Sequence, residues 1–149
     1  MKISHEERRT TLQRQHLQLR SLIATVREAA VAVLEGADAA ELRLRIADLT
    51  TELQAHMATE EALLGPVLER IDAWGPVRLD LMRAEHAHQR GVMALLRSRG
   101  SDALAPEPLA RRTIQLLEEI LSDMDAEDRD ILDAKVLRDD LIQLDASDA

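Results

Sequence analysis

Apolar residues recur at alternating spacings of three and four in four separate stretches of this chain. That spacing predicts amphipathic α-helices with one apolar stripe each. Glycine and proline separate the stretches, so the predicted helices span about residues 4–36, 38–65, 77–99 and 108–144. Short connections between long helices favour an all-α, up-down-up-down antiparallel four-helix bundle.

The predicted helix ends come from local signals. Two residue pairs predict capping boxes at the start of the first two helices: Ser4 with Glu7, and Asp38 with Glu41. The Gly65-Pro66 pair predicts the end of the second helix, with a helical turn or two continuing to residue 71. These boundaries divide the chain into four segments of bundle length.

Length and composition limit the number of domains and the kinds of fold and metal site that the chain can form. A chain of 149 residues fits a single domain, here a bundle core over residues 4–144 followed by an acidic tail over residues 145–149. The absence of cysteine removes disulfides and thiolate metal sites. With one Trp and no Phe or Tyr, the chain also lacks the aromatic residues that sheets favour.

Charge and hydropathy bear on partners and location. The net charge of −9 argues against nucleic acid and anionic membranes as partners. Residues 1–7 contain no apolar run, and no segment approaches 18 consecutive apolar residues. We therefore expect no signal peptide and no membrane span, and a cytoplasmic protein whose protein partners the sequence does not identify.

Polar residues interrupt the apolar stripes at positions that should face the core. They lie on all four predicted helices: His16, His56, Glu60, His86, Asp123 and Glu127. A buried, ionised carboxylate without a partner costs several kcal/mol, and this core would hold three. The sequence therefore predicts a group that neutralises them.

These residues also fall at similar heights along the bundle. His16 and His56 lie 20 residues before and after Gly36, so they face each other across an antiparallel pair. Counting from the later connections gives two more matches: Glu60 with His86, and His86 with Asp123. A lone histidine on a helix stripe is more often an ordinary core residue, but six matched positions on four helices predict a metal site.

The residue types indicate which metal would bind. Three imidazoles and three carboxylates suit iron, manganese or zinc. Six ligands are too many for one tetrahedral zinc and suit two octahedral ions with an oxo or hydroxo bridge. We therefore expect two iron ions, with manganese and zinc as the alternatives. His5 and His88 lie off this set, and we expect both to be solvated.

Together these residues resemble the hemerythrin-like (HHE cation-binding) family, from about Thr10 to Leu132. The strongest similarity is in residues 52–66, where an HxxxE pair, His56 and Glu60, precedes a second acid and a proline-terminated apolar turn. Further matches are His16 on the first helix, Glu85-His86 on the third, and Glu127-Asp128 on the fourth. The resemblance implies an up-down four-helix bundle with an oxo- or hydroxo-bridged di-iron centre.

Two positions depart from the family pattern. Asp123 stands where the fourth helix normally supplies a histidine, and Arg90 stands where oxygen carriers have a second histidine after His86. Fewer imidazoles and more oxygen ligands favour ferric iron, which disfavours reversible oxygen carriage. Alternatively, Arg90 and Asp123 pair with each other and leave a site for one metal or none.

Three functional classes follow from this reading. In the leading hypothesis, a di-iron centre senses or handles oxygen, peroxide, nitric oxide or iron. His16 and His56 hold one iron, His86 and Asp123 hold the other, and Glu60 and Glu127 bridge. The alternatives are a di-iron or di-manganese oxidoreductase or peroxidase-like enzyme, and a metal-depleted helical interaction module.

Overall fold

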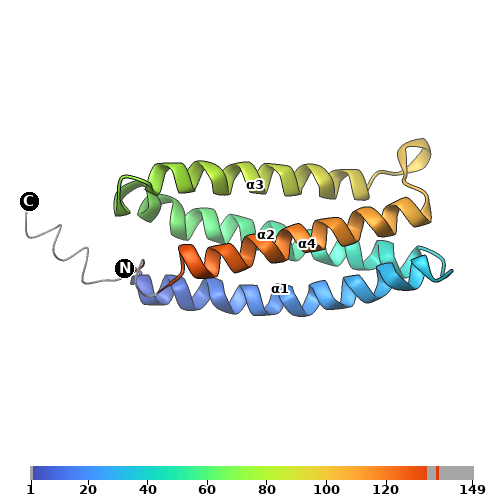
Figure 1. Cartoon of the computed structure of the whole chain (residues 1–149), viewed down its shortest axis with the longest axis horizontal. Coiled ribbons are helices and arrows are strands. Elements are labelled where there is room, and N and C mark those ends of the chain that lie inside the picture. Colours follow the sequence, from blue (N-terminus) through green and yellow to red (C-terminus); the bar gives the residue numbers. More distant parts are fainter. Residues whose placement is uncertain (1, 134–136, 138–149) are drawn as a thin grey trace, which may run out of the picture.

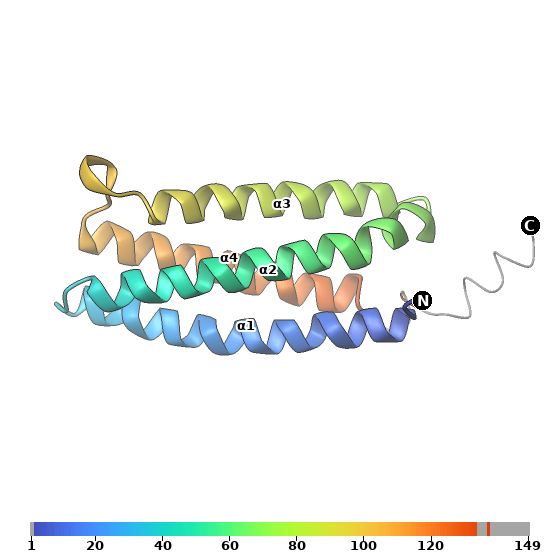
Figure 2. The same cartoon turned by 180° about the vertical axis from the view of Figure 1, so that it is seen from behind.

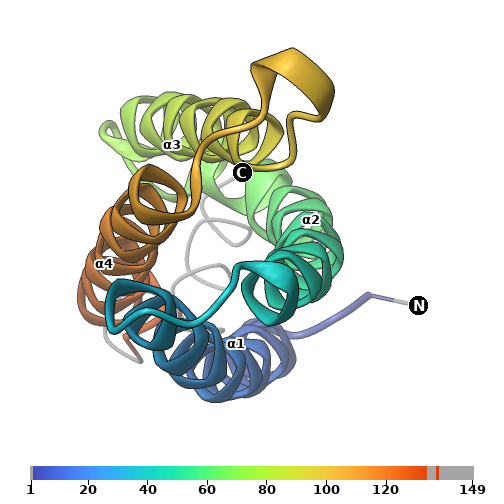
Figure 3. The ribbon, with the colours of Figure 1, turned by 90° about the vertical axis from the view of Figure 1, so that its right-hand side faces the viewer.

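The computed structural model describes residues 2–133 and residue 137. Within these residues the chain forms a bundle of four α-helices, which confirms the predicted fold class (Figures 1 and 2). The elements are α1 (His5–Leu34), α2 (Ala40–Ile71), α3 (Gly75–Leu96), the short 3₁₀ helix η1 (Gly100–Asp102) and α4 (Pro106–Asp130). Each helix runs antiparallel to the one before it, and the end-on view shows the four around one core (Figure 3).

The first helix begins as predicted and the second does not. Ser4 accepts a hydrogen bond from the backbone N–H of Glu7, whose carboxylate in turn accepts one from the N–H of Ser4, so the first capping box is confirmed. At α2 the carboxylate of Asp38 accepts only from the N–H of Ala40. The second predicted box is therefore wrong, because the carboxylate of Glu41 is engaged by Arg45.

The predicted end of the helix at Gly65-Pro66 is also wrong, because α2 passes through Pro66 without a break, and the predicted continuation to residue 71 is confirmed. A proline inside a helix costs about 3 kcal/mol. Burying one Leu or Val side chain gains roughly 1.5–3 kcal/mol, and the surrounding turns bury Leu64, Val67 and Leu68. Burial therefore outweighs the cost of the proline. The apolar spacing of the second helix predicts Leu63 in the core, but Leu64 lies there instead.

The last helix is shorter than the predicted extension to residue 144. α4 ends at Asp130, and the backbone N–H groups of Ile131 and Leu132 both donate to the carbonyl of Glu127. The chain then turns inward, so that Leu132 is fully buried. The predicted tail over residues 145–149 lies outside the described residues.

Two apolar clusters fill the bundle on either side of a polar layer. The larger cluster gathers residues from all four helices and extends toward the end where α1 joins α2. The smaller one combines the start of α1, the end of α2, the start of α3 and residues after α4. Five ionisable side chains are buried among the described residues. Four of them, His16, His56, Glu60 and His86, lie between the clusters, and the fifth is His5 at the start of α1. None of the described helices is long and apolar enough to cross a membrane.

Two glycines of α3 give a matched test of how closely its first residue approaches α2. A Cβ at Gly75, the first residue of α3, would overlap the backbone carbonyl of Leu68 on α2, whereas a Cβ at Gly91 meets nothing within 4 Å. We expect Gly75→Ala to destabilise the protein by on the order of 2 kcal/mol, because backbone must move. Gly91→Ala should stabilise it by roughly 0.5–1 kcal/mol through helix propensity. Denaturant unfolding would check both, and equal stability of the two variants would contradict the close approach at Gly75.

Candidate metal centre

Side chains from all four helices meet in the polar layer. They are His16 from α1, His56 and Glu60 from α2, His86 from α3, and Glu127 from α4. The inward Nε2 atoms lie close to carboxylate oxygens: His16 to Glu127 at 3.1 Å, His56 to Glu60 at 2.7 Å, and His86 to Glu60 at 3.4 Å.

Four of these residues form a compact group that could hold a metal ion. The donor atoms of His16, His56, Glu60 and Glu127 all lie within 4.8 Å of one another. The i, i+4 spacing of His56 and Glu60 places both on the same face of α2, one turn apart. His86 lies at the edge of the group, where it contacts the second oxygen of Glu60.

The outer nitrogens of the histidines are also held in place. Each imidazole contacts an acceptor oxygen on a neighbouring helix through Nδ1: His16 with Asp128 at 2.7 Å, His56 with Gln15 at 2.7 Å, and His86 with Glu61 at 2.9 Å. Because a carboxylate or an amide oxygen can only accept, a proton lies on Nδ1, and in the neutral imidazole the Nε2 lone pair then faces inward. This is the arrangement that orients histidines as metal ligands.

Several inward atoms have no hydrogen-bond partner among the described residues. They are the Nε2 of His16 and one oxygen each of Glu60 and Glu127. With both carboxylates ionised all three are acceptors, so they need either a proton on one of them or a cation, and burying them without either is costly. A cation coordinated by all three would satisfy them together, so the donor set fits a metal ion with mixed nitrogen and oxygen ligands.

Both inner carboxylates are buried, but their pKa values shift in opposite directions. Burial raises the pKa of Glu127 well above that of an ordinary glutamate, and the nearby carboxylate of Glu60 raises it further. Burial also acts to raise the pKa of Glu60, but hydrogen bonds with Glu127 and with the histidines outweigh burial and hold that pKa below its usual value. Without a cation, this pair therefore keeps a proton on Glu127.

The pKa values of two of the histidines also shift in opposite directions. Burial lowers the pKa of His16, although Asp128 opposes the change, so its imidazole stays in the neutral form that binds metals. Burial also acts to lower the pKa of His86, but the carboxylates of Glu60 and Glu61 outweigh it and raise that pKa overall.

Asp123 lies beside the group rather than in it. Its carboxylate accepts a hydrogen bond from the side-chain amide of Gln89 at 2.8 Å. Asp123 nevertheless lines the same inner cavity as His86 and Glu60, with a volume of about 20 Å³. That is enough for about one water-sized occupant.

The alternative pairing of Arg90 with Asp123 does not form among the described residues. The guanidinium of Arg90 instead lies 3.5 Å from the carboxylate of Glu61. Asp123 therefore keeps its carboxylate free of any arginine and directed at the cavity edge. Its role as a metal ligand stays a prediction.

Of the two histidines expected in solvent, one is buried. His88 is exposed and pairs with Glu119 at 2.9 Å, as expected for a surface residue. His5 is 3% exposed, with its Nδ1 3.3 Å from the guanidinium of Arg8. The prediction that His5 is solvated is therefore wrong. Its position in the first turn of α1 gave no sign that this turn lies against the core.

Sequence reasoning did not assign the three acceptors that orient the histidines. Two of them directly follow a predicted ligand, Glu61 after Glu60 and Asp128 after Glu127, and Gln15 directly precedes His16. Neighbours of this kind lie about 100° around the helix from the ligand, toward the adjacent helix. A search for acceptors at these flanking positions would have found all three.

Comparison with known proteins agrees with this geometry. The hemerythrin HHE cation binding domain matches residues 9–134, most of the chain. No curated protein and no solved structure gives a significant match. The matched span contains every residue of the inner group and all three of the acceptors that orient it. The chain therefore belongs to the hemerythrin HHE cation-binding family.

Proposed function

We propose that the chain holds two bridged iron ions in its polar layer and uses them to sense or handle oxygen, peroxide, nitric oxide or iron. The observation that carries this proposal is the set of three oriented imidazoles and two buried carboxylates that meet in one layer, where three of their inward atoms lack a hydrogen-bond partner. With both carboxylates ionised, a set of this kind in the core of a bundle favours binding of a cation.

The ligands divide into two halves. His16 and His56 hold one ion, and His86 with Asp123 holds the other, while Glu60 and Glu127 bridge. The position of Glu60 supports bridging, because one of its oxygens faces His56 and the other faces His86. The oxygen-rich second half favours ferric iron, and manganese or zinc are the alternative metals.

The bound ions would supply redox chemistry, and the protein residues control access to it. The three outer acceptors fix each imidazole, and apolar clusters above and below the layer restrict water. The oxidoreductase alternative has less support. The only aromatic residue outside the histidines is Trp74, which is 68% exposed at the junction of α2 and α3. No aromatic side chain is therefore available beside the centre to store an oxidising equivalent.

The absorption spectrum and metal content of aerobically purified protein test the proposal directly. We expect two irons per chain and near-ultraviolet charge-transfer absorption. His56→Ala should lose most of both, because it removes a ligand of the buried group. His88→Ala is the matched control, since His88 is exposed and outside the group. A wild-type protein that takes up no metal when reconstituted would contradict the proposal.

Metal removal should change stability in a pH-dependent way. A carboxyl group with a raised pKa in the folded state favours folding while protonated, and that contribution is lost as pH rises through its folded pKa. The raised pKa of Glu127 and the raised pKa of His86 act in the same direction. We therefore expect chelator-treated protein to lose melting temperature as the pH rises from mildly acid to mildly alkaline values, with loaded protein changing less. Parallel pH profiles for the two forms would argue against buried ligation.

The outer acceptors give a further test. Asp128 and Asp125 both bind Arg20, but only Asp128 also contacts the Nδ1 of His16. Asp128→Ala should weaken metal binding about 10–100-fold, because it frees the orientation of that imidazole. Asp125→Ala should leave the affinity within about 2-fold. Competition against a chelator of known affinity would measure both, and equal affinities would show that Asp128 does not orient the ligand.

A further inference from the structure

Three of the four seams between adjacent helices are closed beside the metal-binding group. Each is bridged by one of the contacts that orient a histidine: Gln15–His56 between α1 and α2, His16–Asp128 between α1 and α4, and Glu61–His86 between α2 and α3. Two of these seams carry an additional arginine on the outside. Arg20 binds Asp128, and Arg90 lies against Glu61. A cation approaching through either would meet a fixed positive charge.

The seam between α3 and α4 differs. These two helices approach each other less closely than the other neighbouring pairs. α4 supplies Asp123 here in place of an imidazole. Two side-chain contacts cross the seam nearby: Gln89 donates to Asp123, and His88 pairs with Glu119 further out. A carboxylate of this length fills less of the seam than an imidazole with its acceptor would.

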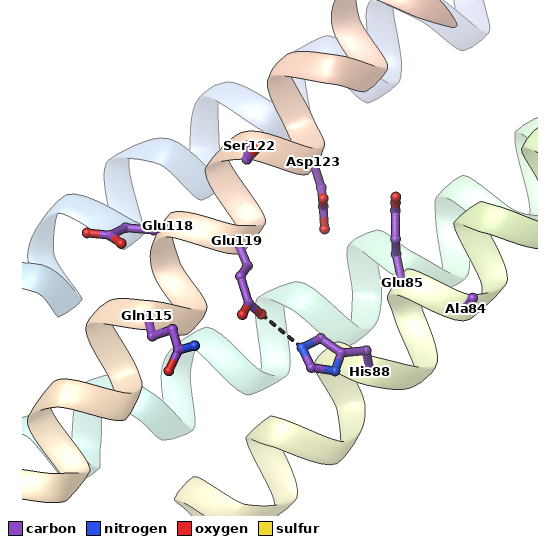
Figure 4. Close-up of a pocket in the computed structure, with 8 residues that line it drawn as sticks. All are labelled: Ala84, Glu85, His88, Gln115, Glu118, Glu119, Ser122 and Asp123. Atoms are coloured by element: carbon purple, nitrogen blue, oxygen red, sulfur yellow. Dashed lines mark hydrogen bonds and ion pairs between the residues drawn. The ribbon is translucent and has the colours of Figure 1, made fainter.

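An open groove of about 660 Å³ lies on the outside of this seam (Figure 4). Glu85 from α3 and Asp123 from α4 both point into the seam, and both line the inner cavity that contains Glu60 and His86. A second hollow, of about 190 Å³, lies next to the first and shares the same two carboxylates. Glu85 and Asp123 thus connect the outer surface with the metal-binding group.

The charge in the larger groove favours cations. The groove is lined by four acidic residues, Glu85, Glu118, Glu119 and Asp123, and among the described residues no lysine or arginine lines it. Its histidine, His88, already contacts Glu119 at 2.9 Å. At the inner end lies Glu60, 2% exposed, with one oxygen that lacks a hydrogen-bond partner. Clefts of one charge sign raise the local concentration and association rate of opposite ions.

We propose that the α3–α4 seam is the route by which a divalent cation reaches and leaves the buried centre, with Glu85 as the carboxylate that receives it at the mouth. The proposal rests on the metal centre proposed above. Glu85 contacts the ion in transit and is not a ligand of the resident ion. It therefore changes the rates of loading and release and not the amount of metal held.

The test measures loading kinetics in the full-length protein. Metal-free protein is mixed with ferrous iron under anaerobic conditions, and uptake is followed by quenching samples with a coloured chelator. Glu85→Gln and Glu85→Lys are compared with Glu52→Gln and Glu52→Lys, which make the same charge changes at an exposed position on α2 outside the groove. Both positions are on the surface, and the final metal content is measured for each of the four variants.

We expect Glu85→Gln to slow loading about 3–10-fold, and Glu85→Lys to slow it more than about 10-fold. Release to excess chelator should slow as well, because the same carboxylate assists both directions. The Glu52 variants should load at the wild-type rate, and all variants should reach the wild-type metal content. High salt should reduce the difference between Glu85→Lys and wild type.

Two results would overturn the proposed route. Loading rates in the Glu85 variants that match their Glu52 controls would show that cations enter elsewhere. A lower final metal content in Glu85→Gln would make Glu85 a resident ligand. Either result leaves the metal centre intact, whereas a wild-type protein that binds no iron at equilibrium would refute the centre itself and the route with it.

Discussion

The rest of the structure depends on the burial of carboxylates in the core of a helix bundle. Glu60 is almost fully buried and Glu127 nearly so, and leaving two such groups ionised without a partner would cost several kcal/mol each. The fold reduces this cost by surrounding them with three imidazoles and by keeping a proton on Glu127 when no cation is bound. Cation binding replaces that proton and satisfies the acceptors that remain. Metal affinity and fold stability are therefore coupled through the same few atoms.

The histidines tie the bundle together as well as lining its centre. Each one spans two helices, with Nε2 in the polar layer and Nδ1 on an acceptor from the next helix. Helices joined in this way have little freedom to slide, because a shift of one residue would break an inward and an outward contact together. The apolar clusters on both sides supply the bulk of the stability, and the polar layer fixes how the helices align.

Much of this arrangement could be predicted from the sequence, because apolar periodicity and helix burial have the same geometric cause. His16 and His86 were predicted to face the core from the first and third helices, and both are buried there. The predictions that were wrong depend on a balance of energies, and the sequence pattern does not contain that balance. Pro66 stays inside α2 because apolar burial around it outweighs its cost. The partner of a histidine Nδ1 depends on side-chain rotamers on the next helix, so Gln15 and Asp128 could not be assigned from spacing within one helix.

Asp123 links the site to the shape of the bundle. The family pattern has a histidine at this position, and an imidazole there would need an outer acceptor, as the other three have, which would close the α3–α4 seam. An aspartate needs no such partner and leaves the seam lined by carboxylates. A closed apolar pocket suits reversible binding of a neutral diatomic ligand, because water and ions are kept from it. An acidic opening suits exchange of the cation itself. Under the proposed function, this single position shifts the balance from oxygen carriage toward a response to iron.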